Sequence, residues 1–232
     1  ASSLWNSITP RKFVRAVDDL LPDEIAFLDV REVDMDWNPR LAAHRVYRYR
    51  LEGMEFWKDP GDVFSQWLRL FEGTYDARNF ARLEEGKNPI RTILSCTPWI
   101  VDGRSVGFEI VGEAFLWNQV RRTAMALHLL ALGEITEDDV RNAIDHPEVE
   151  VDFGVAPPDW LILWGVEWED AQIPDTNSAN CRFSPPPIPS RKAERTMRKR
   201  WRQGARMEMK TLLQLEWMEL GELPVAFHNV KD

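Results

Sequence analysis

The chain has 232 residues, a mass of 27.0 kDa and a formal net charge of −9. Hydrophobic residues make up 44% of it, which excludes a mainly disordered chain, and its length fits one large domain or two small ones. The longest nearly apolar stretch, residues 124–132, is far shorter than the ~20 residues that a membrane-spanning helix needs. No signal peptide is visible, so we expect a cytoplasmic protein with no membrane partner.

Helices and strands are predicted from the spacing of apolar residues and from turn residues. Thr9 followed by Pro10 is typical of the start of a helix. In chain order we expect a helix over 10–21, strands over 25–33 and 44–51, a helix over 62–71, a hairpin of strands 91–101 and 106–111, a helix over 115–132, a helix after Thr136 and a strand over 160–168. Residues 73–89 are expected to form a loop with one short helix. This order predicts an α+β fold with a mixed, mainly antiparallel sheet and helices packed on one face.

A basic segment follows a proline-rich stretch near the C-terminus. Residues 177–190 contain four prolines and predict a stiff linker, and residues 191–206 carry eight basic side chains and one acidic one. If this segment is a helix, one stripe of its surface carries Arg191, Arg195, Arg198 and Arg202. Such a C-terminal basic helix could contact RNA phosphates, or it could pair with the acidic remainder of the protein.

The sequence contains no pattern that indicates a bound metal. Cys96 and Cys181 lie far apart, and the four histidines have none of the spacings of metal ligands. We therefore expect free thiols in a reducing compartment and no metal or other cofactor.

Residues 45–50 alternate between arginine and aromatic or aliphatic side chains. On a strand, Arg45, Tyr47 and Tyr49 share one face, and Arg48 and Arg50 lie on the other. Aromatic rings beside arginines on a sheet are typical of single-stranded RNA binding, in which a ring stacks on a base and a guanidinium binds phosphate. Ordinary packing between neighbouring strands produces the same pattern, so both interpretations stay open.

Arg121 is the most unusual charged residue of the expected helix over 115–132. A helical projection places it among apolar side chains, whereas Arg122 falls beside Asn118 and Gln119 on the polar side. A buried arginine keeps its charge and needs a carboxylate or phosphate partner. The alternative is an arginine whose long side chain reaches water. Residues 158–166 are nearly all apolar and predict only a buried strand.

Taken together and in this order, these segments resemble the tRNA pseudouridine synthases of the TruA family. The resemblance covers roughly residues 7–173. The proline-rich linker and the basic arm resemble archaeal members more than bacterial ones. The matching motifs are residues 20–26, 30–33, 38–40, 45–49, 73–80 with 91–93, 112–121 and 156–166.

This resemblance implies that uridine is converted to pseudouridine at positions 38 to 40 of the tRNA anticodon stem-loop, with no metal or organic cofactor and in a homodimer. Tyr47 matches the tyrosine that packs against the target uridine. Arg121 matches the arginine that pairs with the catalytic aspartate, and Leu161 matches a residue that lines the base pocket. Arg45 lies in the same matched motif as Tyr47, Arg91 lies in the motif of residues 91–93, and both are expected to bind substrate.

The chain departs from the family at the nucleophile. In the family an aspartate sits in a Gly-Arg-Thr-Asp-type motif upstream of the first matched segment, and no such motif occurs here. We expect that the 232 residues lack this N-terminal segment and are inactive by themselves. They would comprise the end of an N-terminal half-domain (1–36), the C-terminal half of the catalytic domain (37–174), the linker (175–190) and the basic helical arm (191–232).

Two other interpretations stay open. One is a non-catalytic RNA-binding module derived from the same fold, and the other is an α+β domain that binds a protein through a tryptophan-rich surface. The residues upstream of Ala1 would distinguish them, because an Arg-Thr-Asp or Arg-Ser-Asp triplet there favours the enzyme.

Overall fold

A computed structural model of the chain describes residues 8–22, 25, 27, 30, 33–101, 103–169, 200, 203 and 207. The chain divides into two units, of which Asn38–Pro174 is one, and Ala1–Trp37 together with Asp175–Asp232 is the other. The first of these units contains every strand of the described residues.

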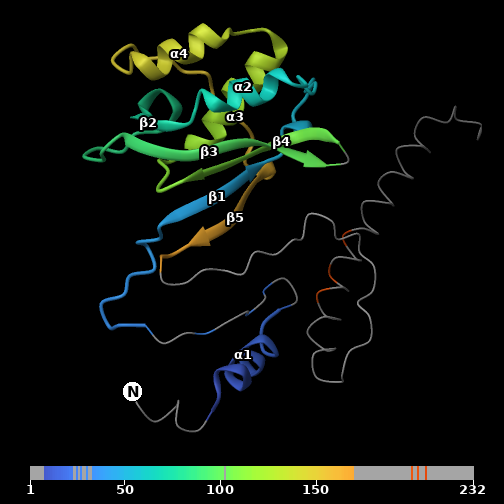
Figure 1. Ribbon diagram of the computed structural model, residues 1–232, viewed down its shortest axis with the longest axis vertical. Coiled ribbons are helices and arrows are strands. Elements are labelled where there is room, and N and C mark those ends of the chain that lie inside the picture. Colours follow the sequence, from blue (N-terminus) through green and yellow to red (C-terminus); the bar gives the residue numbers. More distant parts are fainter. Residues whose placement is uncertain are drawn as a thin grey trace, which may run out of the picture. The chain divides into compact units, whose positions relative to one another are not determined.

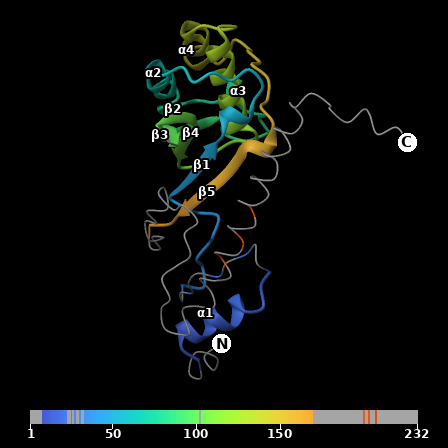
Figure 2. The ribbon, with the colours of Figure 1, turned by 90° about the vertical axis from the view of Figure 1, so that its right-hand side faces the viewer.

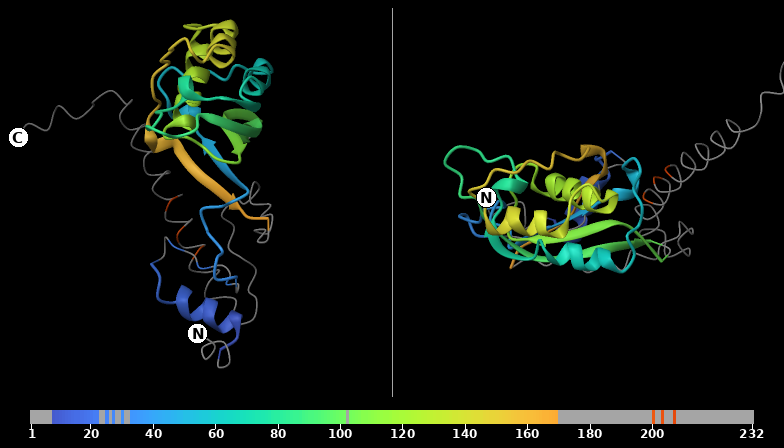
Figure 3. Two further views of the ribbon diagram at one scale, coloured as in Figure 1. Left: turned by 90° about the vertical axis from the view of Figure 1, so that its left-hand side faces the viewer. Right: turned by 90° about the horizontal axis from the view of Figure 1, so that it is seen from above.

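The strands of this unit form one five-stranded sheet (Figure 1). The sheet has the order β2-β3-β4-β1-β5, and each neighbouring pair is antiparallel. Figure 3, left, shows β1 in blue and β5 in orange side by side at one edge. The strands are β1 (His44–Tyr49), β2 (Gly73–Asp76), β3 (Ile90–Val101), β4 (Arg104–Gly112) and β5 (Leu161–Glu167).

Three helices and one face of the sheet share a single hydrophobic core. The helices are α2 (Val63–Arg69), α3 (Gln119–Leu132) and α4 (Glu137–Asp145), which lie in the upper part of Figures 1 and 2. Three short 3-10 helices span Leu51–Gly53, Arg78–Phe80 and Pro158–Trp160. The expected α+β class with a mainly antiparallel sheet is therefore confirmed, and the described sheet is antiparallel throughout instead of mixed. The largest buried side chains of the hydrophobic core include Tyr49, Phe108 and Ile110 from the sheet and Phe64, Leu68, Leu127 and Val140 from the helices.

The ends of α3 and α4 follow from local chemistry. Helix α3 begins at Gln119 and not at 115, because the preceding Asn118 has a left-handed backbone with φ of 63°. It ends at Gly133, whose φ of 73° is the usual glycine conformation after a helix. Helix α4 begins with a capping box, in which the Asp139 backbone N–H donates to the Thr136 hydroxyl and the Asp139 carboxylate accepts from the Thr136 N–H.

Strand β2 was not predicted from the sequence, because residues 73–89 were expected to form a loop with one short helix. Residues 73–76 lack the alternation that marks a strand, and they become one by pairing with β3 from Gly73↔Ile93 to Asp76↔Ile90. Pairing with a distant segment therefore decided the structure at this place.

The other unit contains α1 (Pro10–Asp18), which begins at the expected proline. The strand predicted over 25–33 is wrong for the described residues 25, 27, 30 and 33. The Phe27 N–H donates to the buried Asp18 carboxylate at 2.8 Å and not to a strand partner. The Asp18 carboxylate also lies 3.4 Å from the Arg200 guanidinium, so one cation of the basic segment pairs within its own unit.

Most of the basic segment lies outside the described residues, and so does the proline-rich linker. This holds for Arg191, Arg195, Arg198 and Arg202, whose predicted helical stripe remains an expectation. In the described part of the chain, no helix has the length and apolar composition needed to cross a membrane.

The burial of His128 in α3 leads us to expect that the folded protein loses stability in mild acid. It is 7% exposed and stacks on the Trp57 indole at 6.3 Å between ring centroids. Burial lowers its pKa below the ordinary 6.5, while Glu134 acts in the opposite direction. The unfolded chain therefore takes up a proton first as the pH falls below 6.5, and folding stability falls with it.

The comparison is between the wild-type protein and a His128→Leu variant, by chemical unfolding from about pH 7.5 down to about pH 5. The wild type should lose more unfolding free energy over this interval than the variant, which has no titrating group at this position. Equal losses would mean that His128 titrates normally in the folded protein.

Candidate functional site

Strand β1 directs two tyrosines toward the helices. The ring of Tyr47 meets that of Phe115 edge to face, with centroids 5.1 Å apart. Tyr49 is fully buried, and its hydroxyl donates to the Pro157 carbonyl oxygen at 2.8 Å. Leu161 of β5 lies opposite Tyr49 and packs half-buried against the same core. The structure therefore brings Tyr47 and Leu161 to adjoining positions of the β1–β5 pair.

Arg121 lies in the first turn of α3 and is half-buried. Its Nε donates to the Ala156 carbonyl oxygen at 2.7 Å, and its Nη1 donates to the Asn118 side-chain oxygen at 3.1 Å. The Ala156 N–H in turn donates to the Arg121 carbonyl oxygen at 3.2 Å. These bonds hold the guanidinium in place, so Arg121 is not a side chain that extends freely into solvent.

The acceptors of Arg121 are neutral. Neither of its two hydrogen-bond acceptors among the described residues is a carboxylate, and no ion pair is formed to it there. The guanidinium therefore keeps N–H groups and a full positive charge available for an anion. A half-buried cation held by neutral groups alone favours binding of a carboxylate or phosphate at this place.

Arg121 also acts on the neighbouring Tyr49. Burial raises the pKa of Tyr49 to about 12, the positive charge of Arg121 partly offsets this, and the charge of Asp159 adds to it. The tyrosine is therefore neutral at physiological pH and serves as a hydrogen-bond donor to Pro157. Tyr49 and Arg121 thus both bind the backbone of residues 156–157, which lies between α4 and β5.

Asn118 positions Arg121 and was not identified from the sequence. Its φ of 63° is uncommon for any residue other than glycine, and asparagine tolerates it better than most. In this conformation its side chain accepts from Arg121 and does not cap its own helix. A residue in a sparsely populated backbone conformation next to a charged group is typical of functional sites.

Arg45 lies near Tyr47, but its guanidinium already donates hydrogen bonds to backbone carbonyl oxygens. Arg45 lies two residues along the same face of β1, and its guanidinium donates to the carbonyl oxygens of Glu113 at 2.7 Å and Arg40 at 2.8 Å. These bonds fix the turn after β4 against the segment that precedes β1.

Arg91 is not brought beside Tyr47. It lies on β3, which is separated from β1 by β4, and it donates to the carbonyl oxygens of its neighbours Asn88 and Ile90. Burial lowers its pKa from the ordinary value. In this structure Arg91 stabilises the start of β3.

The polar side of α3 differs from the sequence-based projection. Gln119 was expected on the polar side, but it is only 1% exposed, and its side-chain oxygen accepts from the Leu116 N–H at 2.9 Å. Its amide therefore fixes the turn that leads into α3. Arg122 does lie near the surface, where it pairs with Asp152 at 2.7 Å.

The opposite face of the sheet carries a second set of aromatic and charged groups. The Arg48 guanidinium lies 3.8 Å from the centre of the Trp164 ring and 5.5 Å from that of Trp99, and its Nε donates to the Glu109 carboxylate at 2.7 Å. The expected alternation of residues 45–50 between two faces is confirmed. Because Arg48 is already paired, this cluster stabilises the sheet and offers no free charge.

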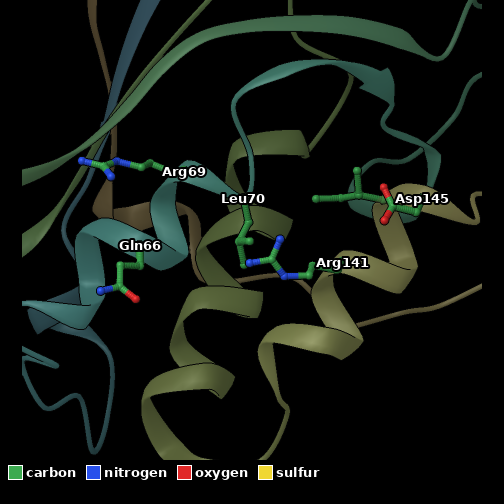
Figure 4. Close-up of a pocket in the computed structure, with 6 residues that line it drawn as sticks. Gln66, Arg69, Leu70, Arg141 and Asp145 are labelled. Carbon is green, nitrogen blue, oxygen red and sulfur yellow. The ribbon is translucent and has the colours of Figure 1, made fainter.

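A groove of about 340 Å³ lies between α2 and α4 (Figure 4). Neither Tyr47, Arg121 nor Leu161 lines it, so it is separate from the site around Arg121. The groove is lined by Gln66, Arg69, Leu70, Arg141, Ile144 and Asp145.

Among the described residues no group of three or more His, Cys, Asp or Glu side chains could hold a metal ion.

The fold and the site together define an α+β domain with a fixed arginine beside aromatic residues of a sheet. A family model described as tRNA pseudouridine synthase matches residues 68–169. Curated proteins named tRNA pseudouridine synthase A are similar as well. That of Thermococcus gammatolerans is 39% identical over 151 residues, which cover 63% of this chain and 53% of the relative.

Two further relatives carry the same name. The Thermococcus onnurineus protein is 34% identical over 151 residues, covering 65% of this chain and 55% of its own length. The Methanoculleus marisnigri protein is 33% identical over 162 residues, covering 68% and 57%. By these matches the chain is similar to the tRNA pseudouridine synthases over residues 68–169, and it spans about half the length of the curated relatives it matches.

Proposed function

We propose that the protein containing this chain isomerises uridine to pseudouridine at positions 38 to 40 of the tRNA anticodon stem-loop. The similarity to tRNA pseudouridine synthases supports the type of reaction. The observation that carries the proposal is the Arg121 guanidinium, half-buried and held by two neutral acceptors at 2.7 and 3.1 Å. This arrangement supports a carboxylate partner, and the nucleophile that we propose for the reaction is a carboxylate.

The catalytic aspartate is proposed to come from a segment N-terminal to these residues. Its carboxylate attacks C1′ of the target nucleotide, and the C1′–N1 bond breaks with its electron pair passing to uracil. The uracil then rotates, C5 bonds to C1′, and the carboxylate leaves. C5 loses its proton and N1 gains one, so the product is an isomer and no cofactor is consumed.

The described residues would serve this reaction in different ways. Arg121 pairs with the aspartate and orients it, Tyr47 packs against the target base, and Leu161 lines the pocket for that base. The base must leave its stack to be reached, and opening costs a few kcal/mol that contacts with such residues can offset. Arg45 and Arg91 are proposed to bind the RNA around the target.

The remaining assignments are proposals of the same kind. The partner is tRNA, the active form is a homodimer, and the protein works in the cytoplasm. Residues 37–174 form the C-terminal half of the catalytic domain. Residues 191–232 form a basic arm, joined to it by the linker over 175–190, in which Arg191, Arg195, Arg198 and Arg202 contact the RNA backbone.

The decisive experiment is mass spectrometry of tRNA after incubation with the full-length protein. Pseudouridine should appear at positions 38 to 40 of a transcript that contains uridine there. Tight binding of tRNA without any pseudouridine would instead identify a non-catalytic RNA-binding module. Neither binding nor product would exclude both functions.

A Tyr47→Ala variant of the full-length protein should form pseudouridine about tenfold more slowly or bind tRNA about tenfold more weakly. The reason is the loss of a ring–base contact worth ~1–3 kcal/mol. A Tyr47→Phe variant keeps the ring and its edge-to-face contact with Phe115, and it should retain most of the activity. Equal activity of the alanine variant and the wild type would remove Tyr47 from the base pocket.

A further inference from the structure

A second arginine–aromatic pair lies beside the site and is not part of the function proposed above. The Arg82 guanidinium lies over the Trp117 ring, 4.3 Å from its centre. The backbones of the two residues are also joined, because the Arg82 N–H donates to the Trp117 carbonyl oxygen at 2.8 Å in an isolated antiparallel bridge. The stack is therefore set by the backbone as well as by the side chains.

Both residues of the stack follow a buried anchor. Ala81 and Leu116 belong to one small buried cluster, and Gln119 binds the Leu116 N–H with its side chain. Trp117 itself is 52% exposed, and Arg82 is exposed. About half of the Trp117 surface is therefore available for a stacking contact with a planar group.

In the described part of the chain, the free charge of Arg82 distinguishes this stack from the arginine–tryptophan stacks of Arg48 and Arg50. Arg48, which also stacks on tryptophan, is paired with Glu109, and Arg50 is paired with Glu52. Among the described residues, by contrast, no carboxylate and no other hydrogen-bond acceptor binds the Arg82 guanidinium. Its edge can donate to an anion while its face remains on the indole.

The stack is adjacent in the chain to the residues that hold Arg121. Trp117 directly precedes Asn118, whose left-handed backbone places its side-chain oxygen 3.1 Å from Arg121. A nucleotide bound by the stack would therefore lie close to the nucleotide at Arg121.

We infer that Arg82 and Trp117 form a binding site for a nucleotide that flanks the target uridine. Arg82 binds a phosphate of the RNA strand, and the base of the flanking nucleotide stacks on the exposed part of the Trp117 indole. Such a pairing of guanidinium and aromatic ring is a general way of holding an unstacked RNA strand. This inference rests on the proposed function, because it takes tRNA to be the substrate.

The test compares variants of the full-length protein for tRNA affinity over a series of salt concentrations. Arg82→Gln should weaken tRNA binding about fivefold to tenfold and reduce the slope of log affinity against log salt by about one unit, because one phosphate contact is lost. Trp117→Ala should weaken binding about tenfold, and Trp117→Phe should restore most of it.

The matched control is Arg141→Gln, which removes the same charge from an exposed site in the groove between α2 and α4. It should leave both affinity and salt slope as in the wild type. If Arg82→Gln has the same affinity and slope as this control, while the wild type modifies tRNA, the inference is wrong and the proposed function stands. A wild-type protein that neither binds nor modifies tRNA would overturn both.

Discussion

A lysine in place of Arg121 is expected to reduce pseudouridine formation by the full-length protein at least about 100-fold. Lysine keeps the positive charge but lacks the planar set of N–H groups that donates to the Ala156 and Asn118 oxygens and leaves further N–H groups for an anion. The aspartate that we propose as the nucleophile would then lose its fixed partner. The measurement is the single-turnover rate of product formation at saturating tRNA, with tRNA affinity recorded beside it.

The neighbouring Arg122 offers a matched control. It pairs with Asp152 near the surface at 2.7 Å, and Arg122→Lys should form pseudouridine at a rate close to that of the wild type. The Arg121→Lys variant should also keep its tRNA affinity, because its effect falls on the reacting groups. Near-normal rates for Arg121→Lys would show that the guanidinium only supports the backbone of residues 156–157.

An alanine in place of Gly107 is expected to destabilise the protein by at least about 3 kcal/mol. A Cβ at this position of β4 would lie 1.9 Å from the Tyr49 carbonyl oxygen and 3.0 Å from the Arg50 Cα. These are backbone atoms of β1 and of the residue that follows it, so they cannot rotate away. The strand that carries Tyr47 and Tyr49 would have to separate from β4, and the site would be distorted with it.

Gly165→Ala is the control for this variant. Gly165 is also a strand glycine, but a Cβ there would meet only Val46, at an ordinary contact distance of 3.7 Å. Its unfolding free energy should stay within about 0.5 kcal/mol of the wild type in chemical unfolding experiments. Equal destabilisation by the two substitutions would show that loss of glycine as such, and not the contact with Tyr49, is responsible.

The candidate site could be predicted from the sequence only where local spacing decides it. The alternation of residues 45–50 places Tyr47 and Tyr49 on one face, and the structure has them there. The helical projection placed Arg121 among apolar neighbours, and the structure has it half-buried. It failed for Gln119, because no periodicity indicates that a buried amide will bind the Leu116 N–H.

The sequence by itself indicated the resemblance to tRNA pseudouridine synthases, the order of most helices and strands, and the position of Arg121 among apolar neighbours. These depend on residue types and on spacings within one element, which a local pattern carries. Only the tertiary structure decided that Ala156 and Asn118 hold the guanidinium, that β2 is a strand and that Arg82 stacks on Trp117. Most of these contacts join segments far apart in the chain, and the Asn118 contact needs a left-handed backbone, so both depend on how the chain packs and not on local periodicity.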